Sequence, residues 1–182
     1  MMDDTPDDAN DINLNASIKY PQQRGREGKP SRRFNRPPHN MAWCWLTAEL
    51  LNSVSWRSMS RNCQKLINRL LLEHCNNAGL ANGNLICTYH QLQKYGLTRN
   101  MIRPAIDEAN FLGLVKNRRG ERVFAKNEPN LYRLTFYGTK DAKDPTNEWK
   151  LVTTERVKAY RKKKKEAKEK RKQYKIKHRS TK

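Results

Sequence analysis

The stretch that decides the fold is NGNLICTYHQLQKYGLTRNMIRPAIDEANFLGLVKNRRG, residues 82–120. Its pattern predicts a short strand at 84–87, a brief helix capped by Thr88 and, after Gly96, a second helix at 98–112. Two short helices joined by a tight turn that contains glycine are the signature of a helix-turn-helix. Residues 82–120 therefore predict that motif, with a strand on its N-terminal side.

A β-hairpin is predicted directly after the second helix. Gly113 ends that helix, and residues 114–117 form the first strand of the hairpin. A basic turn follows at 118–121, and residues 122–124 form the returning strand. Further along, residues 131–137 alternate apolar and polar side chains, which is typical of a half-buried strand. A hairpin in this place makes the motif a winged helix. The alternative is a small α+β domain whose turns fall there by coincidence.

The residues before this stretch predict further helices. Thr47 caps a short helix with Leu50, Leu51 and Val54 facing inward, and residues 55–57 form a turn. Ser60 then caps a helix that runs to about Asn77. Its apolar stripe consists of Cys63, Leu66, Ile67, Leu70, Leu71 and Cys75. Its outer face consists of Arg61, Lys65, Asn68 and Arg69.

Charge divides the chain unevenly. The 182 residues include 38 Lys and Arg against 18 Asp and Glu, a net charge of +20. Residues 155–182 hold fifteen of these basic residues and three acidic ones, which is +12 of the total. Charge of this sign and density attracts polyanions, and nucleic acid first among them. The alternative is that the charge serves solubility alone.

Composition sets the domain boundaries. Hydrophobic residues make up 36% of the chain, which is low for a globular domain, so part of it is expected not to fold. We predict a disordered, proline-rich arm at 1–40, one α+β domain at 41–150, and a basic tail at 151–182 that is disordered or helical. The Trp43–Trp45 segment is either an extra layer of the core or a dimer contact.

The sequence resembles a family of small bacterial winged-helix proteins that are often encoded near phage or plasmid genes. The resemblance covers about residues 45–150 and is carried by residues 82–120 and by SVSWRSMSRNCQKLINRLLLEH, EPNLYRLTF and DPTNEWK. It implies that the helix at 98–112 occupies the recognition position and that the hairpin near Arg119 is the wing. It supports DNA binding, and it implies no role for the basic tail.

In such a fold the first turns of the recognition helix meet base edges in the major groove. The residues expected to contact bases are Thr98, Arg99, Asn100 and Arg103. Asn100, Arg103, Asp107 and Asn110 share one helix face, and Asp107 is expected to pair or cap rather than to read bases. The alternative is an ordinary solvated helix face.

Pro104 complicates this helix, because it removes a backbone donor and its ring crowds the preceding turn. Either the helix kinks there, or it begins at Pro104 and Arg99–Arg103 form a loop that enters the groove.

The wing and the tail supply the other expected contacts. Those of the wing, to the DNA backbone or the minor groove, are Lys116, Arg118, Arg119 and Arg122. The non-specific contacts of the tail are Arg161, Lys162, Lys163, Lys164, Lys165, Lys170, Arg171 and Lys172. Tyr160 and Tyr174 are candidates for stacking on the bases of single strands or RNA. A solvated hairpin and a solvated tail are the alternatives.

Other function classes lack a motif. No phosphate-binding glycine loop, HExxH or CxxC pair occurs, and His39, His74, His90 and His178 accompany no nucleophile pattern. Cys87 and His90 are three residues apart, but we expect no zinc, because the cysteines read as small core residues. We therefore expect that the protein is not an enzyme and that it binds no metal and no cofactor.

No apolar run approaches the length of a membrane span, and the first twelve residues carry five Asp rather than a basic leader. The widely spaced cysteines favour a reducing compartment, so a bacterial cytoplasmic, nucleoid-associated protein is expected.

These features favour a sequence-specific double-stranded DNA-binding protein that acts as a transcriptional regulator. Its sequence shows no ligand domain, so it is expected to act by occupying its site, and a homodimer on paired half-sites is one expected form. One alternative is a replication or mobile-element protein that binds an origin. Another is a non-specific architectural or RNA-binding protein driven by the basic tail.

Overall fold

The computed structural model describes residues 41–177, except residues 121, 124, 125 and 142. The side chains of residues 122, 123, 126, 127, 175 and 177 are also outside the description. The chain divides after Pro38, so every described residue belongs to one unit, His39–Lys182. The predicted arm at 1–40 lies outside the described residues.

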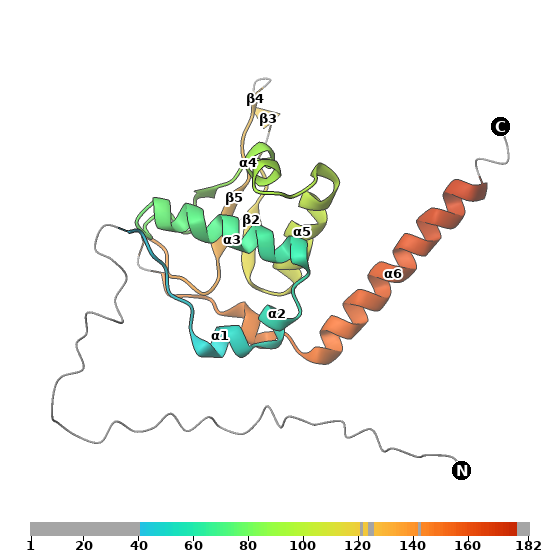
Figure 1. Cartoon of the computed structure of the whole chain (residues 1–182), viewed down its shortest axis with the longest axis horizontal. Coiled ribbons are helices and arrows are strands. Elements are labelled where there is room, and N and C mark those ends of the chain that lie inside the picture. Colours follow the sequence, from blue (N-terminus) through green and yellow to red (C-terminus); the bar gives the residue numbers. More distant parts are fainter. Residues whose placement is uncertain (1–40, 121, 124–125, 142, 178–182) are drawn as a thin grey trace, which may run out of the picture. The chain divides into compact units, whose positions relative to one another are not determined.

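The described residues form a mixed α+β fold (Figure 1). Its α-helices are α1 (Ala48–Asn52), α2 (Val54–Arg57), α3 (Arg61–Asn76), α4 (Tyr89–Lys94), α5 (Arg99–Phe111) and α6 (Thr154–Lys177), and η1 (Glu148–Leu151) is a 3₁₀ turn. Its strands are β1 (Leu85–Ile86), β2 (Val115–Arg118), β3 (Arg122–Val123), β4 (Lys126–Asn127) and β5 (Leu131–Leu134). Strands β1, β5 and β2 form an antiparallel sheet in that order, and β3 pairs with β4.

Side-chain caps fix the helix starts where the sequence predicted them. The Ser60 hydroxyl accepts a hydrogen bond from the Cys63 amide at the start of α3. Thr88 and Gln91 form a reciprocal capping box at the start of α4. Thr47 likewise caps α1. These predictions are confirmed, because a cap depends on residues only three apart.

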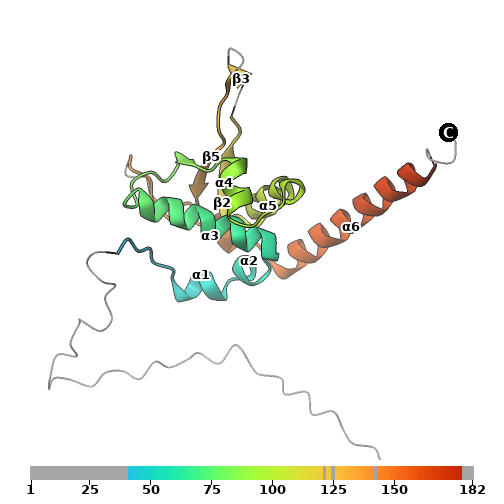
Figure 2. The ribbon, with the colours of Figure 1, turned by 45° about the horizontal axis from the view of Figure 1, so that its top comes forward.

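The hairpin differs from its prediction. The strand that pairs with β2 is β5, not residues 122–124. In the β2–β5 pair, Arg118 faces Leu131. In the β3–β4 pair, Arg122, four residues after Arg118, faces Asn127, four residues before Leu131. The two ladders therefore keep one register, and the hairpin reverses between Val123 and Lys126. Figures 1 and 2 show its β3–β4 end extending beyond α4.

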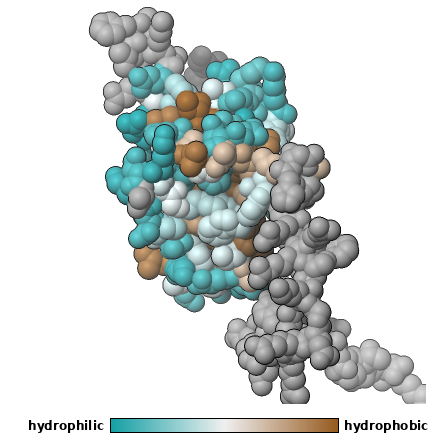
Figure 3. All heavy atoms as spheres, turned by 90° about the vertical axis from the view of Figure 1, so that its left-hand side faces the viewer, coloured by the Kyte–Doolittle hydropathy of each residue, from teal (hydrophilic) through white to brown (hydrophobic). Residues whose placement is uncertain are grey.

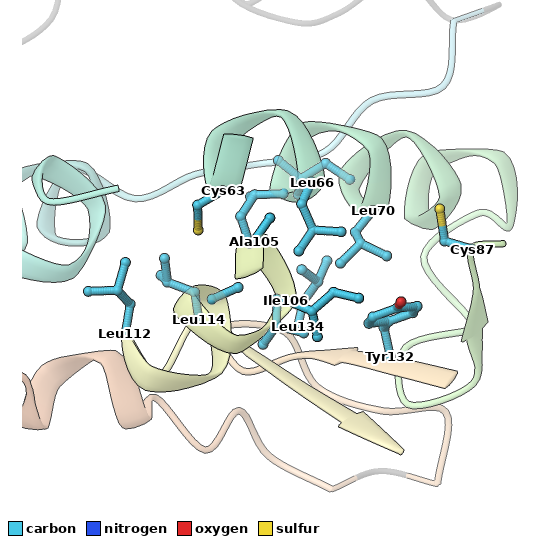
Figure 4. Packing of buried hydrophobic residues seen from close by; sticks show 14 of the residues in the cluster. Cys63, Leu66, Leu70, Cys87, Ala105, Ile106, Leu112, Leu114, Tyr132 and Leu134 are labelled. Carbon is cyan, nitrogen blue, oxygen red and sulfur yellow. The ribbon is translucent and has the colours of Figure 1, made fainter. Parts of the chain in front are cut away.

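The core lies between α3, α5 and the sheet (Figure 4). The predicted stripe of α3 is buried except for Cys75, which is half-buried. On α5, the inward residues are Ile102, Ala105, Ile106 and Ala109. Tyr132 and Leu134 face them from β5 and are fully buried. The alternation predicted for residues 131–137 is therefore confirmed over β5.

Three predictions before residue 70 are wrong. Residues 55–57 belong to helix α2 rather than a turn, and the buried Ser55 hydroxyl donates to the Trp149 carbonyl at 2.9 Å. Leu51 is exposed rather than inward-facing, and Leu50 is the one buried residue of α1. Arg69 is buried rather than on the outer face of α3, and its charge pairs with Glu73 at 2.8 Å.

The folded unit extends past the predicted boundary at residue 150. Trp149, Val152 and Val157 are all buried in the core. The tail that follows is helical: α6 spans 24 residues. Tyr160 stacks on Phe111 of α5, with ring centroids 3.9 Å apart. Contacts that are distant in the sequence thus hold the first turns of α6 against the domain.

Candidate nucleic-acid interface

The turn between α4 and α5 is held rigidly. Gly96 adopts a φ of +91°, which favours glycine, and ends α4. The buried Leu97 follows, and its amide donates to the Leu92 carbonyl at 3.0 Å. Lys65 of α3 donates to the Gly96 carbonyl at 2.7 Å. The direction in which α5 leaves the turn is therefore set by α3 as well as by the turn.

Helix α5 has a buried face and an exposed polar face. The side chains expected to contact bases, Thr98, Arg99, Asn100 and Arg103, are all exposed. The structure brings them together on the N-cap and the first two turns of α5. Arg103 and Asp107 approach to 3.7 Å, but both side chains are more than half exposed, so this ion pair is weak.

Pro104 lies inside α5, which begins at Arg99. The alternative in which Arg99–Arg103 form a loop is therefore wrong. Proline has no amide hydrogen, so the carbonyl of Asn100 has no donor at the usual position four residues on. Three of the four expected base-contacting side chains thus project from regular helix, just before the proline.

Asn110 does not share the exposed polar face as predicted. It is half-buried, and its amide nitrogen donates to the Ile106 carbonyl at 2.8 Å and to the Asn117 side chain at 2.7 Å. Its carbonyl oxygen accepts from the Asn117 amide. Asn110 therefore joins α5 to β2 and fixes where the hairpin leaves the helix.

The basic residues of the hairpin are in different environments. Arg118 and Arg119 are exposed at the end of β2. Lys116 is paired with Glu148 of η1 at 2.9 Å. Arg122 belongs to β3, and its side chain lies outside the described residues. Gly113 allows the approach of η1 to β2, because a Cβ there would lie 2.7 Å from the Glu148 backbone.

The eight basic residues expected to make the contacts of the tail, all between 161 and 172, are exposed on α6. Two of them anchor the helix to the domain: Arg161 donates to the Ser58 carbonyl at 2.9 Å, and Lys164 lies 3.9 Å from Glu108. Lys172 pairs with Glu169 within α6. The other five tail residues of the prediction are Lys162, Lys163, Lys165, Lys170 and Arg171. Because its ring stacks on Phe111, Tyr160 is not presented to bases.

The described histidines and cysteines form no cluster of metal ligands. Among the residues that the structure describes, no three His, Cys, Asp or Glu side chains are placed to hold a metal ion. Cys87 is buried, and burial raises the pKa of its thiol to about 11. Burial also raises the pKa of the Cys63 thiol. Both thiols are therefore protonated and lie among core side chains.

Two further findings concern the described surface. None of the helices within 41–177 combines the length and the apolar character that a membrane span needs. The face shown in Figure 3 is mostly hydrophilic, with separate apolar patches. Trp43 and Trp45 are both exposed. Trp45 also packs edge-on against Tyr137, and its carbonyl accepts a hydrogen bond from the Tyr137 hydroxyl.

No family model, curated protein or solved structure matches the chain.

Proposed function

We propose that this protein binds double-stranded DNA in a sequence-specific manner and acts as a transcriptional regulator, with α3, α4, α5 and the β2–β5 hairpin forming a winged helix. The observation that carries the proposal is the two-sided helix α5. One side is buried on α3 and the sheet, and the other presents Arg99, Asn100 and Arg103 from the first two turns. Recognition helices of this class meet base edges with their N-terminal turns.

The chemistry of these side chains suits the major groove. Arginine donates two hydrogen bonds to O6 and N7 of guanine, and asparagine pairs with N6 and N7 of adenine. The weak pairing of Arg103 with Asp107 is compatible with this role, because an exposed ion pair is given up at little cost. Asp107 next to Arg103 would also repel a phosphate, which favours a base contact over a backbone contact.

The hairpin and α6 would supply contacts to the backbone. Arg118 and Arg119 are exposed where β2 ends and the hairpin continues to β3, the part of a wing that meets phosphates or the minor groove. Helix α6 is anchored beside α5 through Phe111 and Tyr160, so its lysines remain close to the same DNA. Such contacts strengthen binding and fix its orientation without selecting a sequence.

The test is selection of binding sites from a random duplex library with the full chain at physiological salt. We expect a consensus site that Arg103→Ala loses at one or two positions, a change of about 1–3 kcal/mol in discrimination. The matched control is Arg57→Ala on α2, an exposed arginine far from the hairpin in Figures 1 and 2. Sites near promoters would support a regulator, and repeated sites at an origin would support a replication protein instead.

A second candidate, non-specific architectural binding, is favoured by the exposed cations of α6. It predicts that no sequence is enriched in the selection and that Arg103→Ala leaves binding unchanged. It also predicts that binding falls steeply with salt. Either of the first two results would rule out base reading by α5.

A further inference from the structure

A hollow of about 320 Å³ lies on the sheet face that points away from the core. Three segments line it: the loop before β1, the outward side chains of β2 and β5, and the loop after β5. On these strands Val115, Tyr132 and Leu134 point into the core, so Lys116, Arg118 and Arg133 point to the other side. The hollow therefore lies on the opposite sheet face from α5.

The lining of the hollow is strongly basic. Lys116 and Arg133 are directly opposite each other in the β2–β5 register, and Arg118 follows two residues later on the same face. Like charges opposite each other destabilise an antiparallel pair. Lys143 adds a fourth cation from the loop, and Asp141 is the one acidic residue among the described residues of the lining.

Part of this charge is already balanced by the fold. Lys116 is held by Glu148, which is not part of the lining, and the Arg133 guanidinium donates to the Asp144 carbonyl at 3.0 Å. Two polar atoms of the lining, Arg133 Nε and Thr139 Oγ1, are buried and have no hydrogen-bond partner among the described residues. A buried donor without an acceptor is unfavourable, so this part of the lining is not fully satisfied by the fold itself.

The walls are held in place by Asn82, which is buried under the hollow's rim. Its side-chain nitrogen donates to the carbonyls of Leu134, Tyr137 and Gly138, and its oxygen accepts from the Leu134 amide. These bonds join the loop before β1 to the end of β5. The Thr139 amide donates to the Lys143 carbonyl and closes the loop that carries the fourth cation. The site is therefore built before any ligand arrives.

We propose that this hollow binds a phosphate group. Lys116 is already paired with Glu148, and the other three cations of the lining outnumber its one carboxylate, Asp141, which suits a multiply charged anion. Guanidinium groups also match the geometry of phosphate oxygens. The phosphate is either that of a small free ligand or that of a nucleic-acid backbone. The inference goes beyond the proposed function, because the hollow is on the other sheet face from α5 and does not depend on base reading.

The test is titration of the full chain with inorganic pyrophosphate at constant ionic strength, observed through backbone amide resonances. Saturable shifts at residues 83–84, 117–118 and 139–141 are expected. Lys143→Gln should weaken binding about tenfold, which corresponds to the loss of one charge-assisted contact. Lys140→Gln is the matched control, since Lys140 is exposed in the same loop but does not line the hollow. Arg118→Gln is a second variant on the opposite wall.

Shifts that do not saturate, shifts that are larger on α6, or an unchanged affinity in Lys143→Gln would overturn the proposal. A second titration in the presence of a saturating DNA duplex separates the two sources. An unchanged pyrophosphate affinity identifies a small free ligand, and displacement by the duplex identifies the nucleic-acid backbone. A duplex that does not bind at all would count against the proposed function, while the pyrophosphate result would stand.

Discussion

At the scale of single residues, Asn82 does more for the fold than its sequence position indicates. It is buried, and its amide makes four hydrogen bonds to the backbone at the end of β5. Its pattern in the sequence, an Asn-Gly pair after a helix, indicates only a turn. No local signal could have shown this role, because its partners lie more than fifty residues away.

We expect Asn82→Ala to lower the free energy of unfolding by about 3 kcal/mol, since it leaves buried carbonyls and an amide without partners. Urea unfolding followed by circular dichroism measures the change. Asn84→Ala, two residues away and exposed, should change stability by less than about 0.5 kcal/mol. Equal effects of the two substitutions would contradict the account of Asn82.

His74 makes the stability depend on pH. Burial lowers the pKa of its imidazole from the ordinary value of 6.5, and its Nδ1 is buried without a hydrogen-bond partner among the described residues. The unfolded chain therefore binds the proton more readily than the folded chain. The stabilising contribution is present above pH 6.5 and is lost as the pH falls below that value.

Between about pH 7.5 and pH 5.5, the native chain should lose more stability than His74→Phe, which keeps a ring beside Tyr137 but cannot titrate. His90→Phe is the control, because His90 is exposed on α4. Unfolding curves at the two pH values measure the difference. A native chain and a His74→Phe variant with the same pH dependence would show that His74 does not carry it.

At the scale of the elements, local patterns predicted helices better than strand partners. The caps at Ser60 and Thr88 and the end of α5 at Gly113 depend on neighbouring residues, and the sequence contains them all. Which strand pairs with β2 depends instead on bringing together residues such as Arg118 and Leu131, which are about a dozen positions apart in the sequence. The short run at 122–124 resembled a return strand, whereas β5 buries Tyr132 and Leu134 when it pairs.

The candidate site shows the same division. The four expected residues of α5 lie together on its first turns because helical spacing determines which side chains share a face. The basic hollow was missed, although Lys116 and Arg118 were singled out, because Arg133 and Lys143 join them only through the β2–β5 pairing and the loop at 139–143. Alternation along β5 does place Arg133 on the outer face.

Helix α6 depends on its contacts with α5. It is polar on all sides, and repulsion among its lysines opposes helix formation in isolation. Tyr160→Ala removes the stack on Phe111, so amide hydrogen exchange should become faster over residues 158–165 while α3 stays protected. Lys162→Ala, an exposed position two residues on, is the control. Unchanged exchange in Tyr160→Ala would show that the stack does not hold α6.

At the scale of the whole molecule, the proposed function assigns different parts of binding to charge and to shape. Of the net charge of +20, residues 155–182 carry +12. Helix α6, which spans 154–177 and is anchored to the domain that carries α5, includes most of these residues. Under the proposed function, α6 would set how strongly the protein binds any duplex, and α5 would set which duplex it prefers. The two contributions differ in their response to salt, because only phosphate contacts release counterions.

Replacing Lys162, Lys163, Lys165 and Lys170 by Gln tests this division, since Gln keeps helix propensity and removes four exposed charges. If each lysine neutralises one phosphate, the slope of log K against log salt should fall by about 3 to 4. The preference for the selected site over random duplex should stay the same.

Arg103→Ala should have the opposite effects: the preference for the selected site should be lost, and the salt slope should change by less than about 1. Fluorescence anisotropy at four salt concentrations measures both quantities. A quadruple variant that loses its site preference would contradict the assignment of base reading to α5, because α6 would then be selecting sequence itself.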